Sequence, residues 1–356
     1  MMKCISDNCT PLCFLPSGRL VCYKRGKLLI FDKDELVYSY LLFSSIKERW
    51  LACIKPISRL LRLGIRSAIA IDEDNVLLSI GNVIYEFCIS ESKLSKGFFV
   101  GVGIRPLSFT EVNGVEGFDN CIVFGGYLGN FEKKPVHIYK RYGEDDWRIV
   151  YTFEKGAINH VHNIVSDTEG KCIWVMTGDF EESAAFWKVT DNFNKVERYV
   201  YGKQQYRGCV CYPTGNGLLY ATDAPYDANQ IYLFDRENSI VPILEIAGSC
   251  IYSCQCGDKY VFATAVEPDG RYNTTWNLLT KRERGAGIKD MYVHMYAGNL
   301  QVGFNEIYNE KKDLWPYLFQ FGAIKFPNGR NLSKKLFFQP VATKYNDMKL
   351  ISLDLD

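Results

Sequence analysis

Short runs of apolar and β-branched residues recur along the whole chain, separated by turns rich in Gly, Asn, Asp and Pro. Hardly any stretch places apolar residues at the i, i+3, i+4, i+7 spacing of an amphipathic helix over helical length. The pattern therefore predicts an all-β chain built from many short strands.

The strand pattern repeats with a period of roughly 40 to 50 residues, which is typical of the blades of a β-propeller. Two sets of runs keep this period, one for second strands and one for third strands of each unit. Their centres are Phe124, Trp174, Tyr220 and Phe262 in the first set, and Ile138, Phe186, Ile231 and Trp276 in the second. Two registers of similar spacing predict four central blades over about 103–283.

Further units precede and follow these four blades, at 19–42, 67–89 and 321–355. The last unit shows three strands, so we expect a strand from residues 1–13 to complete it and close the ring. The sequence thus predicts a single β-propeller domain over 1–356, with seven four-stranded blades and with six or eight as alternatives. The stretch 284–313 is longer than a blade turn and is predicted to be an insertion.

Composition narrows the function classes. The chain has 356 residues, and 42 Lys and Arg against 41 Asp and Glu leave a net charge of +1, which gives no electrostatic case for a nucleic-acid partner. No apolar run approaches the roughly 18 residues of a membrane span, and we find no secretory leader. Thirteen cysteines, among them Cys172, Cys209 and Cys211, lie mostly in strand-like runs. We therefore expect free thiols, no membrane partner and a cytoplasmic location.

Two turns between predicted third and fourth strands, KVTDNFNKVERYV and KRYGEDDWRIVYTF, resemble partial copies of the Asp-box S/T-x-D-x-G-x-T-W. Thr190 and Asp191 fit the first copy and Trp147 fits the second, while the glycine is absent from both. On these turns and the strand runs around them, the chain resembles the BNR/Asp-box repeat proteins, a sialidase-like and glycosyl-hydrolase-like propeller family, over roughly 100–345. The resemblance implies a propeller in which the box is a structural turn, and it implies carbohydrate as a ligand class.

Propeller geometry brings particular residues to one face. In each blade, the start of the first strand and the loop from the second to the third strand open on the same face, around the central channel. The first-strand starts supply Arg105, His160, His162 and Arg207, and the loops supply Tyr127, Asp179, Asp223, Asn229 and Glu267. Basic and acidic groups together suit an acidic or polyhydroxylated ligand. Alternatively, the arginines cap backbone carbonyls and the aspartates make Asx-turns.

His160 and His162 flank Val161, and alternation along a strand sends both imidazoles to the same side. Such a pair could act in acid/base chemistry near neutral pH, or hold a divalent metal with Asp179 or Asp223. We favour acid/base work or substrate binding and expect no metal or other cofactor, because no third histidine lies at a partner position. In the alternative interpretation both imidazoles make only structural hydrogen bonds.

Two function classes remain open. The first is a carbohydrate-active propeller, a glycoside hydrolase or polysaccharide lyase acting on an acidic saccharide at the central-channel face. Its catalytic residues would be His160, His162, Tyr127 and Asp179, and its substrate-binding residues Arg105, Arg207, Asp223, Asn229 and Glu267. The second is a non-catalytic propeller that binds a glycan or a protein, and the absence of any complete catalytic signature motivates it.

Overall fold

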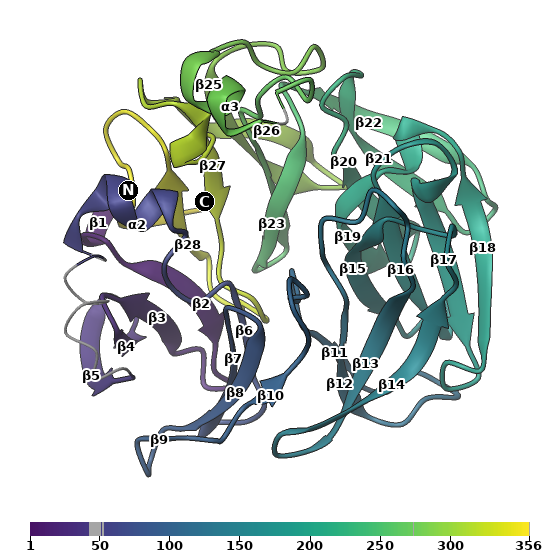
Figure 1. Cartoon of the computed structure of the whole chain (residues 1–356), viewed down its shortest axis with the longest axis horizontal. Coiled ribbons are helices and arrows are strands. Elements are labelled where there is room, and N and C mark those ends of the chain that lie inside the picture. The colour runs from purple at the N-terminus through teal and green to yellow at the C-terminus, as the bar shows by residue number, and fades with distance from the viewer. Residues whose placement is uncertain (43–50, 52, 273, 356) are drawn as a thin grey trace.

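The computed structural model describes residues 1–356 except 43–50, 52, 273 and 356. Its strands form seven antiparallel sheets arranged around a common axis, as Figure 1 shows from one end of that axis. The chain is therefore a seven-bladed β-propeller, which confirms the predicted fold class and the favoured blade count.

In blades 1 to 6 the innermost strand comes first along the chain, whereas blade 7 takes its outermost strand from the start of the chain. Blade 1 contains β2 (Thr10–Phe14), β3 (Leu20–Lys24), β4 (Lys27–Asp32) and β5 (Glu35–Leu41), and blade 2 contains β6 (Ser67–Ala70), β7 (Asn75–Ile80), β8 (Val83–Cys88), β9 (Lys93–Leu94) and β10 (Phe98–Phe99). Blade 3 contains β11 (Thr110–Val112), β12 (Cys121–Gly125), β13 (Val136–Gly143) and β14 (Asp146–Phe153), and blade 4 contains β15 (His160–Asp167), β16 (Cys172–Gly178), β17 (Ala185–Thr190) and β18 (Lys195–Tyr201). Blade 5 contains β19 (Gly208–Thr214), β20 (Gly217–Thr222), β21 (Asn229–Asp235) and β22 (Ile240–Ile246), and blade 6 contains β23 (Cys250–Cys256), β24 (Lys259–Thr264), β25 (Tyr292–Asn299) and β26 (Gly303–Lys311). Blade 7 contains β27 (Ala323–Lys325), β28 (Lys335–Val341), β29 (Leu350–Asp354) and β1 (Met2–Ser6).

The ring closes through the first strand of the chain. β1 pairs with β29 as the outermost strand of blade 7, whereas β2 is the innermost strand of blade 1. The segment 1–13 was predicted to complete the last blade, and its first half does so. The edge strand β29 is covered by this pairing, and the two termini lie on the same side of the ring (Figure 1).

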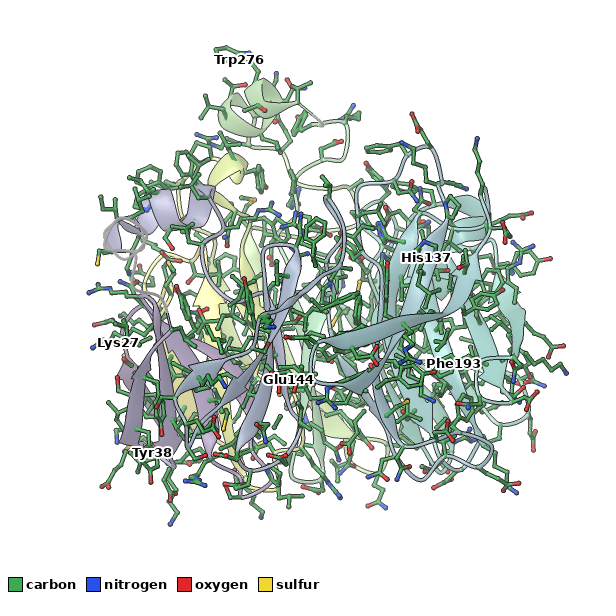
Figure 2. The ribbon with its side chains drawn as sticks, turned by 60° about the horizontal axis from the view of Figure 1, so that its bottom comes forward. Lys27, Tyr38, His137, Glu144, Phe193 and Trp276 are labelled. Atoms are coloured by element: carbon green, nitrogen blue, oxygen red, sulfur yellow. The ribbon has the colours of Figure 1, made fainter. Side chains whose placement is uncertain are left out.

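Blade 6 differs from its prediction. The run around Trp276 was expected to be a third strand, but it forms the helix α3 (Thr275–Thr280), and the third strand is β25. Most of the predicted insertion at 284–313 is therefore β25 and β26, and the extra chain of this blade lies between β24 and β25. In Figure 2 the labelled Trp276 stands out from one face of the ring, whereas Tyr38 of β5 lies toward the opposite side.

Helices are short throughout the described chain. Besides α3 they comprise α2 (Lys55–Leu60) and the single 3-10 turns η1 (Glu181–Ser183), η2 (Gln204–Tyr206) and η3 (Tyr317–Phe319). No helix among the described residues combines the length and the apolar character needed to cross a bilayer.

The core consists of seven hydrophobic clusters, one between each pair of neighbouring blades. Between blades 3 and 4, for example, Val123 and Ile138 pack against Ile164 and Val175. Both faces of a blade are thus covered, and every residue of β16 is buried. Three cysteines named above, Cys172, Cys209 and Cys211, are buried free thiols inside these clusters, as predicted.

The loop between β27 and β28 of blade 7 reaches three other blades through Asn328. The Asn328 side-chain amide donates to the carbonyl oxygens of Ala68 at 3.1 Å and Phe109 at 3.2 Å. Its backbone N–H donates to Leu12 O at 2.8 Å, and its carbonyl accepts from Phe14 N at 2.9 Å. One asparagine therefore connects blade 7 to blades 1, 2 and 3, at Ala68 within β6 and at Phe109 directly before β11.

Candidate functional site

Ionisable side chains gather at the axis where the innermost strands begin. Arg66 immediately precedes β6, His160 is the first residue of β15, and Arg207 immediately precedes β19. Arg105 lies before β11, and its backbone N–H and carbonyl both pair with Tyr127 of the β12–β13 loop at 3.1 Å. The first-strand starts and the second-to-third loops therefore meet at one face, as the propeller geometry predicts.

The two histidines of blade 4 lie on the same side of β15. Their ring centroids are 4.9 Å apart, and Nε2 of His160 lies 3.0 Å from Nε2 of His162. The Val161 side chain points to the opposite side of β15. It packs against blade 3, in the space where a Cβ on Gly125 would lie. Both imidazoles are buried, at 5% and 4% exposure.

Each imidazole is held by a backbone carbonyl of a neighbouring blade. Nδ1 of His160 donates to Leu128 O at 3.0 Å, and Nδ1 of His162 donates to Gly208 O at 3.1 Å, since a carbonyl can only accept. The ring of Tyr127 also packs on His160, with centroids 4.3 Å apart. The two rings are therefore fixed in orientation from blades 3 and 5.

Asp179, at the end of β16, brings a carboxylate to both rings. Its Oδ1 lies 3.3 Å from Nε2 of His160, from Nε2 of His162 and from Nη2 of Arg207. Arg207 also donates from Nη1 to the Asp179 carbonyl at 3.2 Å, and so does the Gln204 side chain at 3.1 Å. Burial would raise the pKa of Asp179, but the two adjacent histidines outweigh it and hold the pKa well below its usual range.

Arg207 is shared between two aspartates. Its Nε lies 3.5 Å from Oδ2 of Asp223, and the thiol of Cys209 donates to the same oxygen at 3.3 Å. Burial would lower the pKa of Arg207, yet the charges of Asp223, Asp179 and Glu267 raise it. The Arg207 guanidinium therefore already contacts two carboxylates of the protein itself.

The pKa of Glu267 is shifted in the opposite direction to the pKa of Asp179. Burial, reinforced by the charge of Asp223, raises the pKa of Glu267 to about 8 from its usual 4.5, and its Oε2 is buried without a hydrogen-bond partner. At neutral pH this carboxyl is therefore protonated while Asp179 is ionised.

A second group of cations lies on the side of the axis formed by blades 2, 3 and 7. The Arg66 guanidinium sits over the Tyr127 ring at 5.4 Å, and its Nε is buried without a hydrogen-bond partner. Burial lowers the pKa of Lys325 to about 8, and the charges of Arg66 and Arg62 lower it further. Burial likewise lowers the pKa of Arg66, with contributions from Arg105 and Arg62. The positive charges of these residues therefore repel one another.

Most of the predicted site residues meet in this region. His160, His162, Asp179, Arg207 and Asp223 form one contact network, and Tyr127 and Arg105 border it. Burial raises the pKa of Tyr127 well above its usual range, so its hydroxyl stays protonated.

Asn229 is the predicted site residue that the structure does not bring into the network. Its side chain is fully buried, accepts from Ala224 N at 2.8 Å and Thr222 Oγ1 at 3.0 Å, and donates to Ala224 O at 2.8 Å. Both ends of its amide therefore hold the β20–β21 loop, which leaves nothing for a ligand.

Arg66, Cys209 and Lys325 join the site without having been predicted. Arg66 follows the same rule as Arg207, a cation directly before a first strand, and applying the rule to blade 2 would have found it. Cys209 and Lys325 lie inside apolar runs and carry no such signal.

The comparisons with known proteins bear on the fold. No protein-family model matches the sequence, and no curated protein matches it. Among solved structures, a chain of a mitotic checkpoint complex is 7% identical with a TM-score of 0.55, covering 100% of this chain and 94% of that one. The Cps50 (Swd1) beta-propeller domain of Myceliophteria thermophila is 10% identical with a TM-score of 0.55, covering 99% and 97%. The CNH domain of AfRom2 is 8% identical with a TM-score of 0.54, covering 100% and 99%. At such identities these likenesses establish the propeller fold alone.

Proposed function

We propose that this propeller binds an anionic ligand, of the class of acidic saccharides, at the axial face where its innermost strands begin. The observation that carries the proposal is the group Arg66, Arg105 and Lys325. These side chains come from three different blades, the charge of Arg66 acts on both of the others, and within the described part of the chain none of them forms an ion pair with a carboxylate.

Unpaired cations in a partly buried region are costly, because desolvation disfavours the charged form and like charges repel. The cost is visible in the lowered pKa values of Lys325 and Arg66, for which burial is the first cause. A carboxylate or phosphate placed between these side chains would remove both penalties at once. The arrangement is therefore suited to hold an anion.

The opposite side of the axis suits the hydroxyl groups of a sugar. Asp179 is ionised and its side chain is 28% exposed, so its carboxylate is available as an acceptor. The Tyr127 ring lies between the two sides, since the Arg66 guanidinium sits over it at 5.4 Å and His160 packs against it at 4.3 Å. A ligand with one acidic group and several hydroxyls would use both sides, and this supports an acidic saccharide over a bare anion.

Binding accounts for the geometry of the histidines better than turnover does. His160 and His162 were predicted to be catalytic, but each is tied to a backbone carbonyl and both face Asp179. A general base needs a lone pair directed at the substrate. The two rings are instead directed at each other.

Glycoside hydrolysis is a second candidate, favoured by one observation. Glu267, with its pKa raised to about 8, is protonated at neutral pH, whereas the pKa of Asp179 is held low. Two carboxyl groups shifted in opposite directions are the usual pair of an acid and a base or nucleophile in glycosidases. If the protein hydrolyses its ligand, Glu267→Gln will abolish turnover and leave binding intact.

The binding proposal is tested by calorimetric titration with tri-galacturonate and sialyllactose, with maltotriose as the neutral control and inorganic phosphate as the bare anion. We expect an acidic saccharide to bind, maltotriose to bind at least about tenfold more weakly, and phosphate to bind weakly at the same residues. Arg66→Met and Arg105→Met should each weaken binding about tenfold or more, because each removes a charge-assisted hydrogen bond.

Arg148→Met is the matched control, since Arg148 lies on β14, the outermost strand of blade 3, and pairs with Asp146. Binding lost equally in the Arg148 variant, or no preference for acidic over neutral saccharide, would contradict the proposal. Phosphate binding more tightly than either acidic saccharide would replace the saccharide with a phosphate-bearing ligand.

A further inference from the structure

Three acceptor atoms from β15 and the end of β16 converge in blade 4. Nε2 of His160 and Nε2 of His162 lie 3.0 Å apart, and each lies 3.3 Å from Oδ1 of Asp179. The histidines are buried and Asp179 is partly exposed. The proposed cation group on blades 2, 3 and 7 does not include the two histidines, and the saccharide proposal uses only the exposed side of Asp179. The position of the two rings therefore needs its own explanation.

The hydrogen bonds of the two rings fix where their protons are. Nδ1 of each ring lies next to a backbone carbonyl oxygen, at 3.0 Å for His160 and 3.1 Å for His162. A carbonyl oxygen only accepts, so both Nδ1 atoms carry hydrogen, and in a neutral imidazole the other nitrogen then carries a lone pair. Three lone-pair-bearing atoms therefore face one another within 3.3 Å.

Protons do not satisfy this triangle completely. One proton on His160 Nε2 could be donated to His162 or to Asp179, but the lone pair of His162 would still face the Asp179 carboxylate at 3.3 Å. Protonating both rings would place two N–H groups against each other across 3.0 Å. A cation that accepts three lone pairs at once resolves all three contacts.

The geometry points to a metal centre in which His160 Nε2, His162 Nε2 and Asp179 Oδ1 together bind one divalent transition-metal ion. A triangle with edges of 3.0, 3.3 and 3.3 Å can be touched at all three corners by an ion about 2.1 Å away, within the roughly 2.0–2.2 Å of zinc bonds to histidine and carboxylate. Two imidazoles favour zinc, iron, nickel or copper over calcium and magnesium, which prefer oxygen ligands.

The surroundings of the triangle resemble the outer shell of a metal site. Metal-binding histidines usually donate their second ring N–H to a carbonyl or carboxylate, which orients the ring, and both histidines do so here. Arg207 Nη2 lies 3.3 Å from the same Oδ1 of Asp179, and a carboxylate oxygen can receive a donor and a metal in different directions. With three protein ligands, the partly exposed side next to Asp179 remains open to water or to a ligand.

A second grouping, His162 with Cys209 and Asp223, shares one histidine with the first. There the thiol of Cys209 donates to Oδ2 of Asp223, and Asp223 also pairs with Arg207. Asp223 is thus already opposed by the positive charge of Arg207, and Cys209 holds its proton against Asp223 rather than offering a thiolate. The triangle with Asp179 is therefore the site we assign.

The test uses the full chain, stripped of metal by a chelator and titrated calorimetrically with Zn²⁺, with Co²⁺ absorbance as the spectroscopic probe. We expect one equivalent of Zn²⁺ to bind, Co²⁺ to give the visible bands of a coordinated ion, and Ca²⁺ and Mg²⁺ to give no signal. His162→Ala should abolish the Co²⁺ bands. Asp179→Asn, which keeps the volume of the side chain, should weaken Zn²⁺ binding by about 100-fold, at or beyond the usual effect of losing an outer-shell partner.

His137→Ala is the matched control, because His137 lies on β13 in blade 3 and its ring bonds to Thr152 Oγ1 at 2.8 Å. Should His162→Ala fail to fold, histidine NMR of the unmodified protein still decides: Zn²⁺ should shift the ring resonances of His160 and His162 and leave those of His137 unchanged. Absence of Zn²⁺ binding, or equal binding by the Asp179→Asn and unmodified proteins, would overturn the assignment.

Discussion

The imidazole of His162 rests directly on Gly178, the last residue of β16, which pairs with His160 across the two strands. A Cβ on Gly178 would lie 2.1 Å from Cε1 and 2.5 Å from Nε2 of His162, which is closer than real Cβ contacts occur. The same ring donates from Nδ1 to Gly208 O on blade 5. Absence of a side chain at position 178 therefore sets where His162 can be.

Replacing Gly178 with alanine should displace this ring. We expect Gly178→Ala to destabilise the fold by roughly 1–3 kcal/mol, the usual cost of overpacking, and to abolish Zn²⁺ binding. Gly143→Ala is the control, since a Cβ there meets nothing within 4 Å. Urea denaturation and calorimetry measure the two effects, and a Gly178→Ala protein that binds Zn²⁺ normally would refute the role of the contact.

Glu267 should make the stability of the protein fall as pH rises. Its pKa is raised to about 8 from 4.5, by burial and by Asp223, so between these values the folded state holds a proton that the unfolded chain has released. Stability therefore decreases with pH across that window. Glu267→Gln cannot ionise, so its stability relative to the unmodified protein should rise between pH 5 and pH 8, by on the order of 2 kcal/mol.

Urea denaturation at pH 5, 6, 7 and 8 measures this difference directly. Glu237→Gln, at an exposed position, is the control and should show no such trend. A difference between Glu267→Gln and the unmodified protein that stays constant across the series would show that Glu267 titrates normally.

Replacing Asn328 should destabilise the innermost strands of blades 2 and 3. Its amide donates to Ala68 O and Phe109 O, and Asn328→Ala would leave both carbonyls without this donor. We expect a loss of roughly 1–3 kcal/mol and faster amide exchange in β6 and β11. Asn305→Ala, on the exposed outer strand β26, is the control. Unchanged exchange in β6 and β11 would show that the blades do not need this link.

The repeat of strands along the chain was enough to predict the propeller, because each blade buries both faces and so keeps a regular pattern of apolar runs. The prediction failed in blade 6, where TTWNLL has the composition of a strand. There the hydroxyl of Thr274 accepts from Asn277 N at 3.2 Å and begins α3. The N-cap at Thr274 therefore favours a helix over the strand that the apolar pattern predicts.

The site was predictable in position but not in pairing. The rule for first-strand starts correctly brought His160 and Arg207 to the axis. The sequence pattern does not give the directions of the side chains. In the structure Arg207 contacts Asp179 and Asp223, and the two histidines face each other. Lys325 has no sequence signal, since it ends a three-residue strand and approaches Arg66 only through closure of the ring.

A crystal structure of the protein with bound galacturonate oligosaccharide tests the central claim most directly. The account predicts a sugar carboxylate in contact with Arg66 and Arg105, with Lys325 near it and hydroxyls toward Asp179. A sugar bound elsewhere on the ring, or an axis that stays without ligand at saturating oligosaccharide, would contradict it.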